Sequence, residues 1–287
     1  MLIENFNLKS TLESGQFFNW VKNEDDYYLS VRKSLIKAEN SSSGKWRFTI
    51  KEGPLQKDEL LEFFNLEKDL RYIIMQFNKD IFTQKAVSKY SGLRVVKQDL
   101  FECLVSFIIS SNNRIDRIKA IVNKLGEKYG GRFNTSLPIY PFPDLALLEK
   151  ASVEDFKELG LGYRAKYLYK SIKMFPELND ALLKYSNEKD FENCRHTLLK
   201  FPGIGPKVAE CIMLYSLSFD NAFPVDVWVK KILCKYDSKF DCNCKNIYCK
   251  HKSSFIQEYF NGYAGWAQLY LFHYLRNNSK NYDKISI

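Results

Sequence analysis

Residues 201–211 read FPGIGPKVAEC, and this stretch constrains the fold most because it places a glycine turn directly before the start of a helix. Pro206 suits the first position of a helix, since the N–H group that proline lacks would have no partner there. Apolar residues with helical spacing follow, namely Val208, Ala209, Ile212 and Met213. Lys207 is unexpected at this place, because the positive end of the helix dipole favours an acidic residue.

The glycine turn is the centre of a predicted helix-hairpin-helix module near residues 190–216. Glycines such as Gly203 and Gly205 let a phosphate approach the bare N–H groups of a helix N-terminus, so this module grips a DNA backbone without reading its sequence. A similar segment, GLGYR, occupies residues 160–164. The same pattern also serves as a plain connection between helices, and the module occurs in proteins that bind DNA without performing chemistry.

The rest of the chain indicates an α+β fold with a small mixed part and a larger helical part. Residues 1–53 contain strand-like alternation of apolar and polar side chains, with a hairpin turn at 40–44. From Gln98 onward, apolar residues recur with helical period. We therefore expect a domain with an antiparallel sheet at 1–80 and a mostly helical domain at 81–287.

Three local patterns predict how individual helices begin and end. Asp58 should open an amphipathic helix, and Asp99 with Glu102 resembles a capping box before a strongly apolar helix. The apolar residues near the C-terminus predict one helix over about 255–277.

The charge balance favours a polyanionic partner. The chain has 43 Lys and Arg against 34 Asp and Glu, a net charge of +9, which suits nucleic acid but also fits a surface that is simply rich in lysine. No apolar run is long enough to span a membrane, and residues 1–15 lack the apolar core of a signal peptide. We expect an intracellular, DNA-associated protein, in the cytoplasm or nucleoid if its source is bacterial, whose seven cysteines are thiols.

Lys207 has three interpretations. It could bind phosphate as a cation, or it could be a solvated surface residue. As a third possibility it is a nucleophile, because the positive helix end and a nearby apolar wall both disfavour the ammonium and so favour the neutral amine that attacks. The turn alone does not choose among them.

Asp226 is the expected partner of Lys207, nineteen positions further on. It interrupts the apolar stretch FPVDVWV, where a carboxylate is either the N-cap of a helix or a functional group. The two roles are compatible, since a carboxylate held at a helix start can also face a developing positive charge.

Six blocks in a fixed order resemble the 8-oxoguanine DNA glycosylase family of helix-hairpin-helix DNA glycosylases. They extend over nearly the whole chain and read SGQFFNW, SSNNRIDRI, GLGYRAKY, FPGIGPKVAECI, PVDVWV and YAGWAQLYLF. The resemblance implies a bifunctional enzyme, a DNA N-glycosylase (a hydrolase) that is also a lyase at abasic sites. It further implies a monomer that binds double-stranded DNA containing oxidised guanine, and a reaction that needs no metal or organic cofactor.

The resemblance also implies roles for individual residues. Lys207 would attack C1′ of the damaged nucleotide and form a Schiff base, and Asp226 would support positive charge on the sugar. The residues implied to surround the flipped base are Gly15, Cys211, Pro224, Gln268 and Phe272. Gly15 would accept a hydrogen bond from N7–H of the lesion, an atom that carries no hydrogen in normal guanine.

Two of these pocket residues lie four positions apart, which puts Gln268 and Phe272 on one face of a helix. In the family, the glutamine contacts the Watson–Crick edge of the base and the phenylalanine stacks on it, with the thiol of Cys211 on the other side. Without the surrounding blocks, ordinary core packing would explain Phe272 and Cys211 equally well.

A flipped base leaves a gap in the duplex, and its former partner must be held. By resemblance, Asn112, Arg117 and Arg164 lie at this gap and at the opposite cytosine, and Tyr163 is the wedge beside them. We therefore expect a preference for cytosine opposite the lesion. Taken alone, Arg117 would be a solvated helix residue and Asn112 a turn residue or a helix C-cap.

The chain departs from the family pattern at two places. Trp228 stands where many relatives carry a histidine that contacts phosphate, and Arg114 replaces an asparagine. A separate cluster of three cysteines and one histidine has the ligand types of a tetrahedral zinc site, and consists of Cys242, Cys244, Cys249 and His251. Its spacing is not that of a common zinc finger, so free thiols are the favoured interpretation and no metal is expected.

Two rival functions remain. One is a glycosylase for another damaged purine, such as an alkylated one, against which Lys207 argues because strictly monofunctional relatives lack this amine. The other is a non-catalytic helix-hairpin-helix protein in which Lys207 only contacts phosphate.

Overall fold

The computed structural model describes residues 1–41, 45–233 and 248–278. Its N-terminal part contains one five-stranded antiparallel sheet in the order β1-β5-β4-β3-β2. The strands are β1 (Leu2–Ile3), β2 (Trp20–Asn23), β3 (Asp26–Val31), β4 (Ser34–Ser41) and β5 (Lys45–Glu52). The predicted hairpin is confirmed by the pairing of Ser41 with Lys45, while turn residues 42–44 lie outside the described residues.

Two short helices complete the sheet part, α1 (Leu8–Glu13) and α2 (Lys57–Phe63). Their apolar faces and the sheet form one hydrophobic cluster with an aromatic centre, in which the rings of Phe6, Phe48 and Phe64 lie within 4.9–6.1 Å of one another. The predicted start of α2 at Asp58 is wrong by one residue, because the helix already begins at Lys57.

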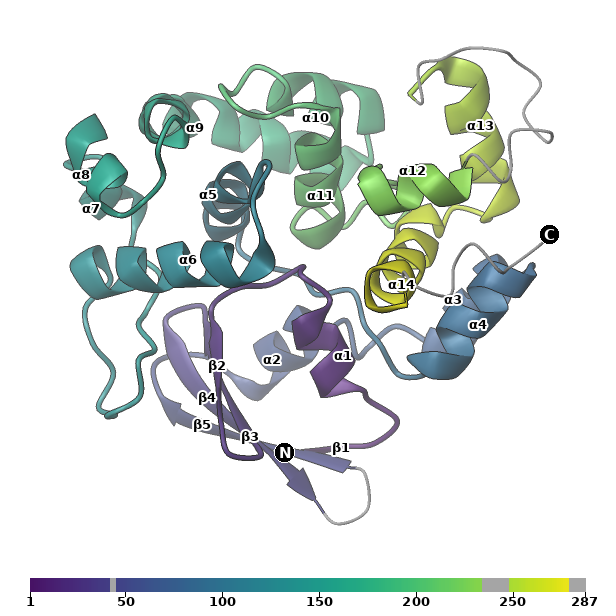
Figure 1. The fold of residues 1–287 in the computed structure, drawn as a ribbon, viewed down its shortest axis with the longest axis horizontal. Helices are drawn as coiled ribbons and strands as arrows, with labels where there is room; N and C mark the ends of the chain where they lie inside the picture. The colour runs from purple at the N-terminus through teal and green to yellow at the C-terminus, as the bar shows by residue number, and fades with distance from the viewer. Residues whose placement is uncertain (42–44, 234–247, 279–287) are drawn as a thin grey trace.

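The remaining chain is helical, which confirms the predicted fold class. In Figure 1 this helical part lies above the sheet. Its elements are α3 (Leu70–Phe77), α4 (Ile81–Lys89), α5 (Leu100–Ser110), α6 (Ile115–Tyr129), α7 (Leu145–Leu148), α8 (Val153–Glu158), α9 (Arg164–Glu188), α10 (Phe191–Leu198), α11 (Pro206–Tyr215), α12 (Val227–Leu233), α13 (Lys250–Tyr259) and α14 (Ala264–Asn277). Within the described ranges, no helix is long and apolar enough to cross a bilayer.

The single helix expected over 255–277 is wrong. The structure has two helices there, α13 and α14, because α13 ends at Tyr259 and the left-handed residues Asn261 and Gly262, with φ of 48° and 77°, separate it from α14. The capping box before α5 is only half formed. Asp99 accepts a hydrogen bond from the backbone N–H of Glu102, but the buried Glu102 carboxyl bonds to Asn19 instead of returning to the cap.

Helix α14 is the central element of the helical part and carries part of the site. It is buried on nearly all sides, as expected for a helix that is apolar around its whole circumference. A Cβ at Gly265 would lie 2.4 Å from Leu214 Cδ1 and 2.6 Å from the carbonyl oxygen of Ala222, so only glycine allows this approach. The start of α14 is further held by Asp220, which accepts hydrogen bonds from the Gly265 N–H and from Trp266 Nε1.

The chain passes from the hydrophobic cluster of the sheet part to the hydrophobic core of the helical part between α2 and α3. Leu60 and Phe63 of α2 pack with the sheet, whereas Ile73 and Phe77 of α3 pack with the helical core. The division at residue 80 stays a prediction, and the change of core lies closer to residues 64–70.

Candidate active site

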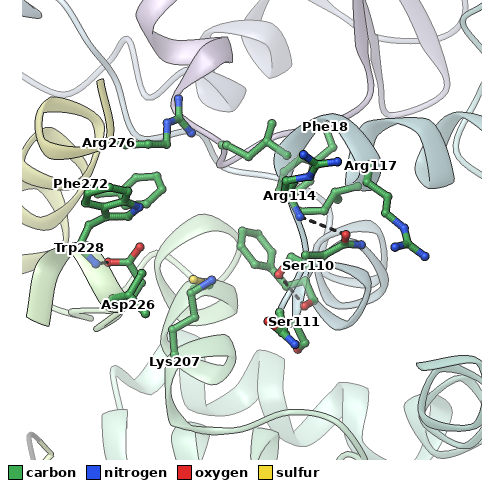
Figure 2. A pocket seen from close by; sticks show the side chains of 18 of the residues that line it. Phe18, Ser110, Ser111, Arg114, Arg117, Lys207, Asp226, Trp228, Phe272 and Arg276 are labelled. Carbon is green, nitrogen blue, oxygen red and sulfur yellow. Dashed lines mark hydrogen bonds between the residues drawn. The ribbon is translucent and has the colours of Figure 1, made fainter. Parts of the chain in front are cut away.

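A cavity of about 1240 Å³ opens where five separate segments meet. Its walls come from the turn after α1, the α5–α6 turn, the first turns of α11, residues 225–228 and the face of α14. Figure 2 shows Lys207 between one wall with Asp226, Trp228 and Phe272 and another with Ser110 and Arg114. Residues distant in the sequence are thus brought to one site.

The helix-hairpin-helix module positions Lys207 as predicted. Gly203 is left-handed with φ of 83°, Gly205 is the N-cap of α11, and Pro206 is its first residue. Lys207 therefore projects from the first turn of α11 into the cavity, with Nζ 5.6 Å from the centroid of the Phe107 ring. The Phe107 ring is thus an apolar group beside the amine, and the effect on the protonation of Lys207 stays a prediction.

Asp226 is both an N-cap and a cavity residue. Its Oδ1 accepts hydrogen bonds from the N–H groups of Trp228 at 3.0 Å and Val229 at 2.8 Å, which starts α12. Burial raises the pKa of Asp226, while those hydrogen bonds and the nearby charge of Lys207 act in the opposite direction. The carboxylate thus lies within electrostatic reach of the amine.

Three predicted base-binding residues share the cavity with this pair. Cys211 lies one turn after Lys207 on α11, and burial raises the pKa of its thiol to about 11. Gln268 and Phe272 lie one turn apart on α14. Gln268 is buried, and its Oε1 accepts no hydrogen bond within the described part of the chain, so it presents an unused acceptor to the cavity.

Gly15 also lines the cavity, in the turn after α1 and next to Arg276 of α14. It takes φ of 83°, a conformation that favours glycine, and a Cβ there would lie 2.6 Å from Ile115 Cδ1. Pro224 behaves differently, since it is buried and does not line the cavity, although it leads directly into Val225 and Asp226, which do. Its contact with a base stays a prediction.

The residues expected near the opposite base gather around the α5–α6 turn, which forms one rim of the cavity. Asn112 and Arg117 line the cavity there, whereas Tyr163 and Arg164 do not. Arg164 is buried and donates hydrogen bonds to the carbonyl oxygens of Ser111 and Asn112, so it holds the α5–α6 turn. Arg117 donates to the carbonyl of Gly160 at 3.1 Å. The structure therefore brings the 110–113 and 160–164 turns together.

The outermost predicted residues of this rim are Asn112 and Tyr163. Asn112 is exposed and left-handed with φ of 49°, a turn residue just after α5. The Tyr163 ring is 56% exposed and lies under the Arg164 guanidinium at 4.4 Å from its centroid. An exposed aromatic ring on a cationic support has the form expected of a wedge, and its contact with DNA stays a prediction.

Two family models match consecutive parts of the chain. One, described as "8-oxoguanine DNA glycosylase, N-terminal domain", matches residues 2–104, and the other, described as "HhH-GPD superfamily base excision DNA repair protein", matches residues 105–241. The N-glycosylase/DNA lyase OGG1 of Arabidopsis thaliana is 31% identical, with 92% of this chain and 76% of that relative covered. The chain belongs to the 8-oxoguanine DNA glycosylase family.

Other members of this family agree with the assignment. The N-glycosylase/DNA lyase of Saccharomyces cerevisiae is 29% identical, with 92% of this chain and 82% of that relative covered. A solved 8-oxoguanine glycosylase/lyase of Clostridium acetobutylicum, in complex with double-stranded DNA containing cytosine opposite 8-oxoG, is 34% identical with a TM-score of 0.83. The match covers 96% of this chain and 94% of that one. The predicted resemblance is confirmed.

The departures from the family pattern also line the cavity. Trp228 lies beside Phe272, and Lys231 is 4.7 Å from the centroid of its ring. Arg114 is the exposed residue that precedes α6.

Three cavity cations were not predicted from the sequence, namely Lys119, Lys230 and Arg276. Lys119 lies with its ammonium over the ring of Trp20, and burial lowers the pKa of Lys119 to about 8. Arg276 lies at the end of α14 and reaches back to Glu13. A sequence signal existed for Arg276 and Lys230, since each lies four positions after a residue predicted to belong to the site, whereas no such residue lies one helical turn from Lys119.

The zinc candidates lie only partly within the described residues. Cys242 and Cys244 are outside them, while Cys249 is half-buried just before α13 and His251 is exposed. Among the described residues, no group of three or more metal-ligating side chains forms.

Proposed function

We propose that this protein removes 8-oxoguanine from double-stranded DNA and then cleaves the strand at the resulting abasic site. The observation that carries this proposal is the common cavity in which Lys207 faces Asp226 beside the unpaired amide oxygen of Gln268. The amine can act as the nucleophile of a Schiff-base glycosylase, the carboxylate can stabilise positive charge on the sugar, and the amide can contact the edge of the base.

The chemistry begins when the target nucleotide is extruded into the cavity. The neutral amine of Lys207 attacks C1′, and the bond from C1′ to the base nitrogen breaks, so the base leaves with its bonding electron pair and takes up a proton. Ring opening and loss of a proton from the lysine nitrogen give the Schiff base. Removal of a C2′ hydrogen then expels the 3′ phosphate by β-elimination.

The Asp226 carboxylate supports the first step electrostatically. The sugar gains positive charge at C1′ as the base departs, and a fixed carboxylate nearby stabilises that charge. Asp226 is fixed because two backbone N–H groups hold its Oδ1, at 2.8 and 3.0 Å. Its role requires the ionised form.

The lesion itself would be distinguished by a backbone oxygen. The turn at Gly15 forms the cavity wall facing α14, from which Gln268 and Phe272 project. A carbonyl of this turn accepts a hydrogen bond from N7–H of 8-oxoguanine, whereas normal guanine would present a lone pair there. The amide of Gln268 pairs with the Watson–Crick edge, and Phe272 stacks against the purine.

We also propose a preference for cytosine opposite the lesion. Arg117 lines the cavity beside Asn112, and the buried Arg164 holds the turn that follows α5 through the carbonyl oxygens of Ser111 and Asn112. Guanidinium groups suit the acceptor atoms on the base edge of cytosine. The enzyme would act as a monomer and would be found wherever the cellular DNA is.

Borohydride trapping tests the proposal directly. Reduction should fix a covalent adduct between the protein and a duplex containing 8-oxoguanine opposite cytosine, and Lys207→Gln should abolish it. Lys200→Gln is a matched control, because Lys200 is an exposed lysine of the same module that does not line the cavity. Intact DNA binding without any adduct would overturn the proposal and favour a non-catalytic DNA-binding protein.

A further inference from the structure

Helix α14 carries a third cavity residue in line with the two that are expected to read the base. Gln268, Phe272 and Arg276 follow one another at intervals of one helical turn, and all three line the cavity. Arg276 is at the end of the helix, closest to the turn with Gly15. Its guanidinium therefore lies between two groups to which the proposed function assigns base recognition.

The contacts of the guanidinium join those two groups. Its Nη2 donates a hydrogen bond to the carbonyl oxygen of Glu13, two residues before Gly15. Its Cζ lies 5.3 Å from the centroid of the Phe272 ring. Its Nη1 would be 3.3 Å from a Cβ at Gly15, so this cation touches the glycine turn directly.

Burying the Arg276 guanidinium lowers the stability of the folded protein, which packing alone would not require. The guanidinium is largely buried, and Nη1 has no hydrogen-bond partner within the described residues. A buried cation with an unused donor destabilises the folded state compared with an apolar side chain of similar size. The charges of Glu13, Asp116 and Asp226 offset part of this penalty. A functional role would explain why an arginine and not an apolar side chain occupies position 276.

We propose that Arg276 is a positioning residue that holds the Gly15 turn at a fixed distance from Phe272, and so sets the discrimination between 8-oxoguanine and guanine. This inference rests on the proposed function. The two bases differ at N7 by one hydrogen. The carbonyl of the Gly15 turn must therefore lie at hydrogen-bond distance and angle from N7 if it is to distinguish them. Arg276 supplies that restraint by joining α14 to the turn after α1.

The test measures discrimination by binding, in a Lys207→Gln background that cannot turn over. Dissociation constants are compared for duplexes with 8-oxoguanine opposite cytosine, with guanine opposite cytosine, and with a tetrahydrofuran abasic-site analogue. Arg276→Met should reduce the preference for 8-oxoguanine over guanine by about tenfold, while affinity for the abasic duplex changes by less than about threefold. The abasic duplex has no base to read, so it reports general damage to the fold.

Two further variants sharpen the result. Arg276→Lys keeps the charge and a donor for the Glu13 carbonyl but loses the flat guanidinium beside Phe272, so it should recover only part of the preference. Lys230→Met removes an exposed cation of the same cavity and should weaken binding to all three duplexes equally. If Arg276→Met does not fold, Arg276→Lys carries the same comparison.

The outcomes separate this inference from the proposed function. An unchanged preference in Arg276→Met, or an equal loss on the abasic duplex, would overturn the positioning role alone. A Lys207→Gln parent with no preference for 8-oxoguanine would overturn the proposed function and this inference with it.

Discussion

The Glu210 carboxylate accepts a hydrogen bond from the backbone N–H of Phe223 at 3.0 Å. Glu210 lies on α11, three residues after Lys207, and Phe223 lies three residues before Asp226. The other carboxylate oxygen pairs with Arg195 of α10 at 3.3 Å. This buried pair therefore links the helix that carries the nucleophile to the segment that carries its carboxylate.

Removing this link should destabilise the protein by a measurable amount. Glu210→Ala would leave the Arg195 guanidinium and the Phe223 N–H without their buried partner, which should lower the free energy of unfolding by about 3–5 kcal/mol. Glu210→Gln keeps an acceptor for the N–H and should lose less. Urea denaturation of both variants makes the comparison, and equal losses would show that the hydrogen bond to Phe223 contributes nothing.

Asp226→Asn separates the two roles of this residue. Asparagine is also a good N-cap, so α12 should be preserved and lesion binding should stay within about threefold. Loss of the carboxylate charge should lower single-turnover base release by about 100-fold or more. Unchanged turnover would reduce Asp226 to a helix cap.

The pH dependence of base release should follow the same carboxylate. Because burial raises the pKa of Asp226, activity should fall as the pH is lowered through a value above the ordinary range of aspartate. Single-turnover rates measured between pH 4 and 8 make this visible. An acidic limb at or below the usual aspartate pKa would contradict the assignment.

Gly15→Ala should weaken discrimination against normal guanine more than it weakens overall DNA affinity. The new methyl group would lie 2.6 Å from Ile115 Cδ1, and φ of 83° is unfavourable for alanine, so the turn must shift. Adding Ile115→Val removes Cδ1 and should recover the part of the loss caused by the clash. Binding to 8-oxoguanine and guanine duplexes measures both, and equal losses on the two would refute the role of the turn.

Local patterns predicted the parts of the site that depend on neighbours in the sequence. The Gly-Ile-Gly-Pro order was enough to place Lys207 in the first turn of α11, and the apolar stretch around Asp226 was enough to identify an N-cap. The interval of four between Gln268 and Phe272 put them on one helix face. Their joint pocket came from the family resemblance and not from spacing.

Contacts between distant segments could not be predicted in this way. Arg276 bonds to the carbonyl of Glu13, which lies 263 positions earlier, and no helical or strand period relates the two. Glu102 likewise does not complete the capping box, because its carboxyl group is hydrogen-bonded to Asn19, which lies just before β2. Tertiary packing decided both. The break between α13 and α14 is instead local, at the left-handed residues Asn261 and Gly262, where apolar periodicity alone suggested one longer helix.

His273 should make the stability of the protein depend on pH in the acidic range. It is 2% exposed on α14, and burial together with the charges of Arg276 and Lys89 lowers the pKa of His273 to about 4. In the unfolded chain His273 is protonated below about pH 6.5, whereas in the folded chain it is protonated only below about pH 4. The free energy of unfolding is therefore at its full value above pH 6.5 and decreases as the pH falls toward 4. The loss should be about 3 kcal/mol. The free energy of unfolding should be measured by urea denaturation at several pH values for the wild type and for His273→Gln. The variant should lose less stability than the wild type between pH 6.5 and 4, and an equal loss in the two proteins would show that His273 is not the group that titrates.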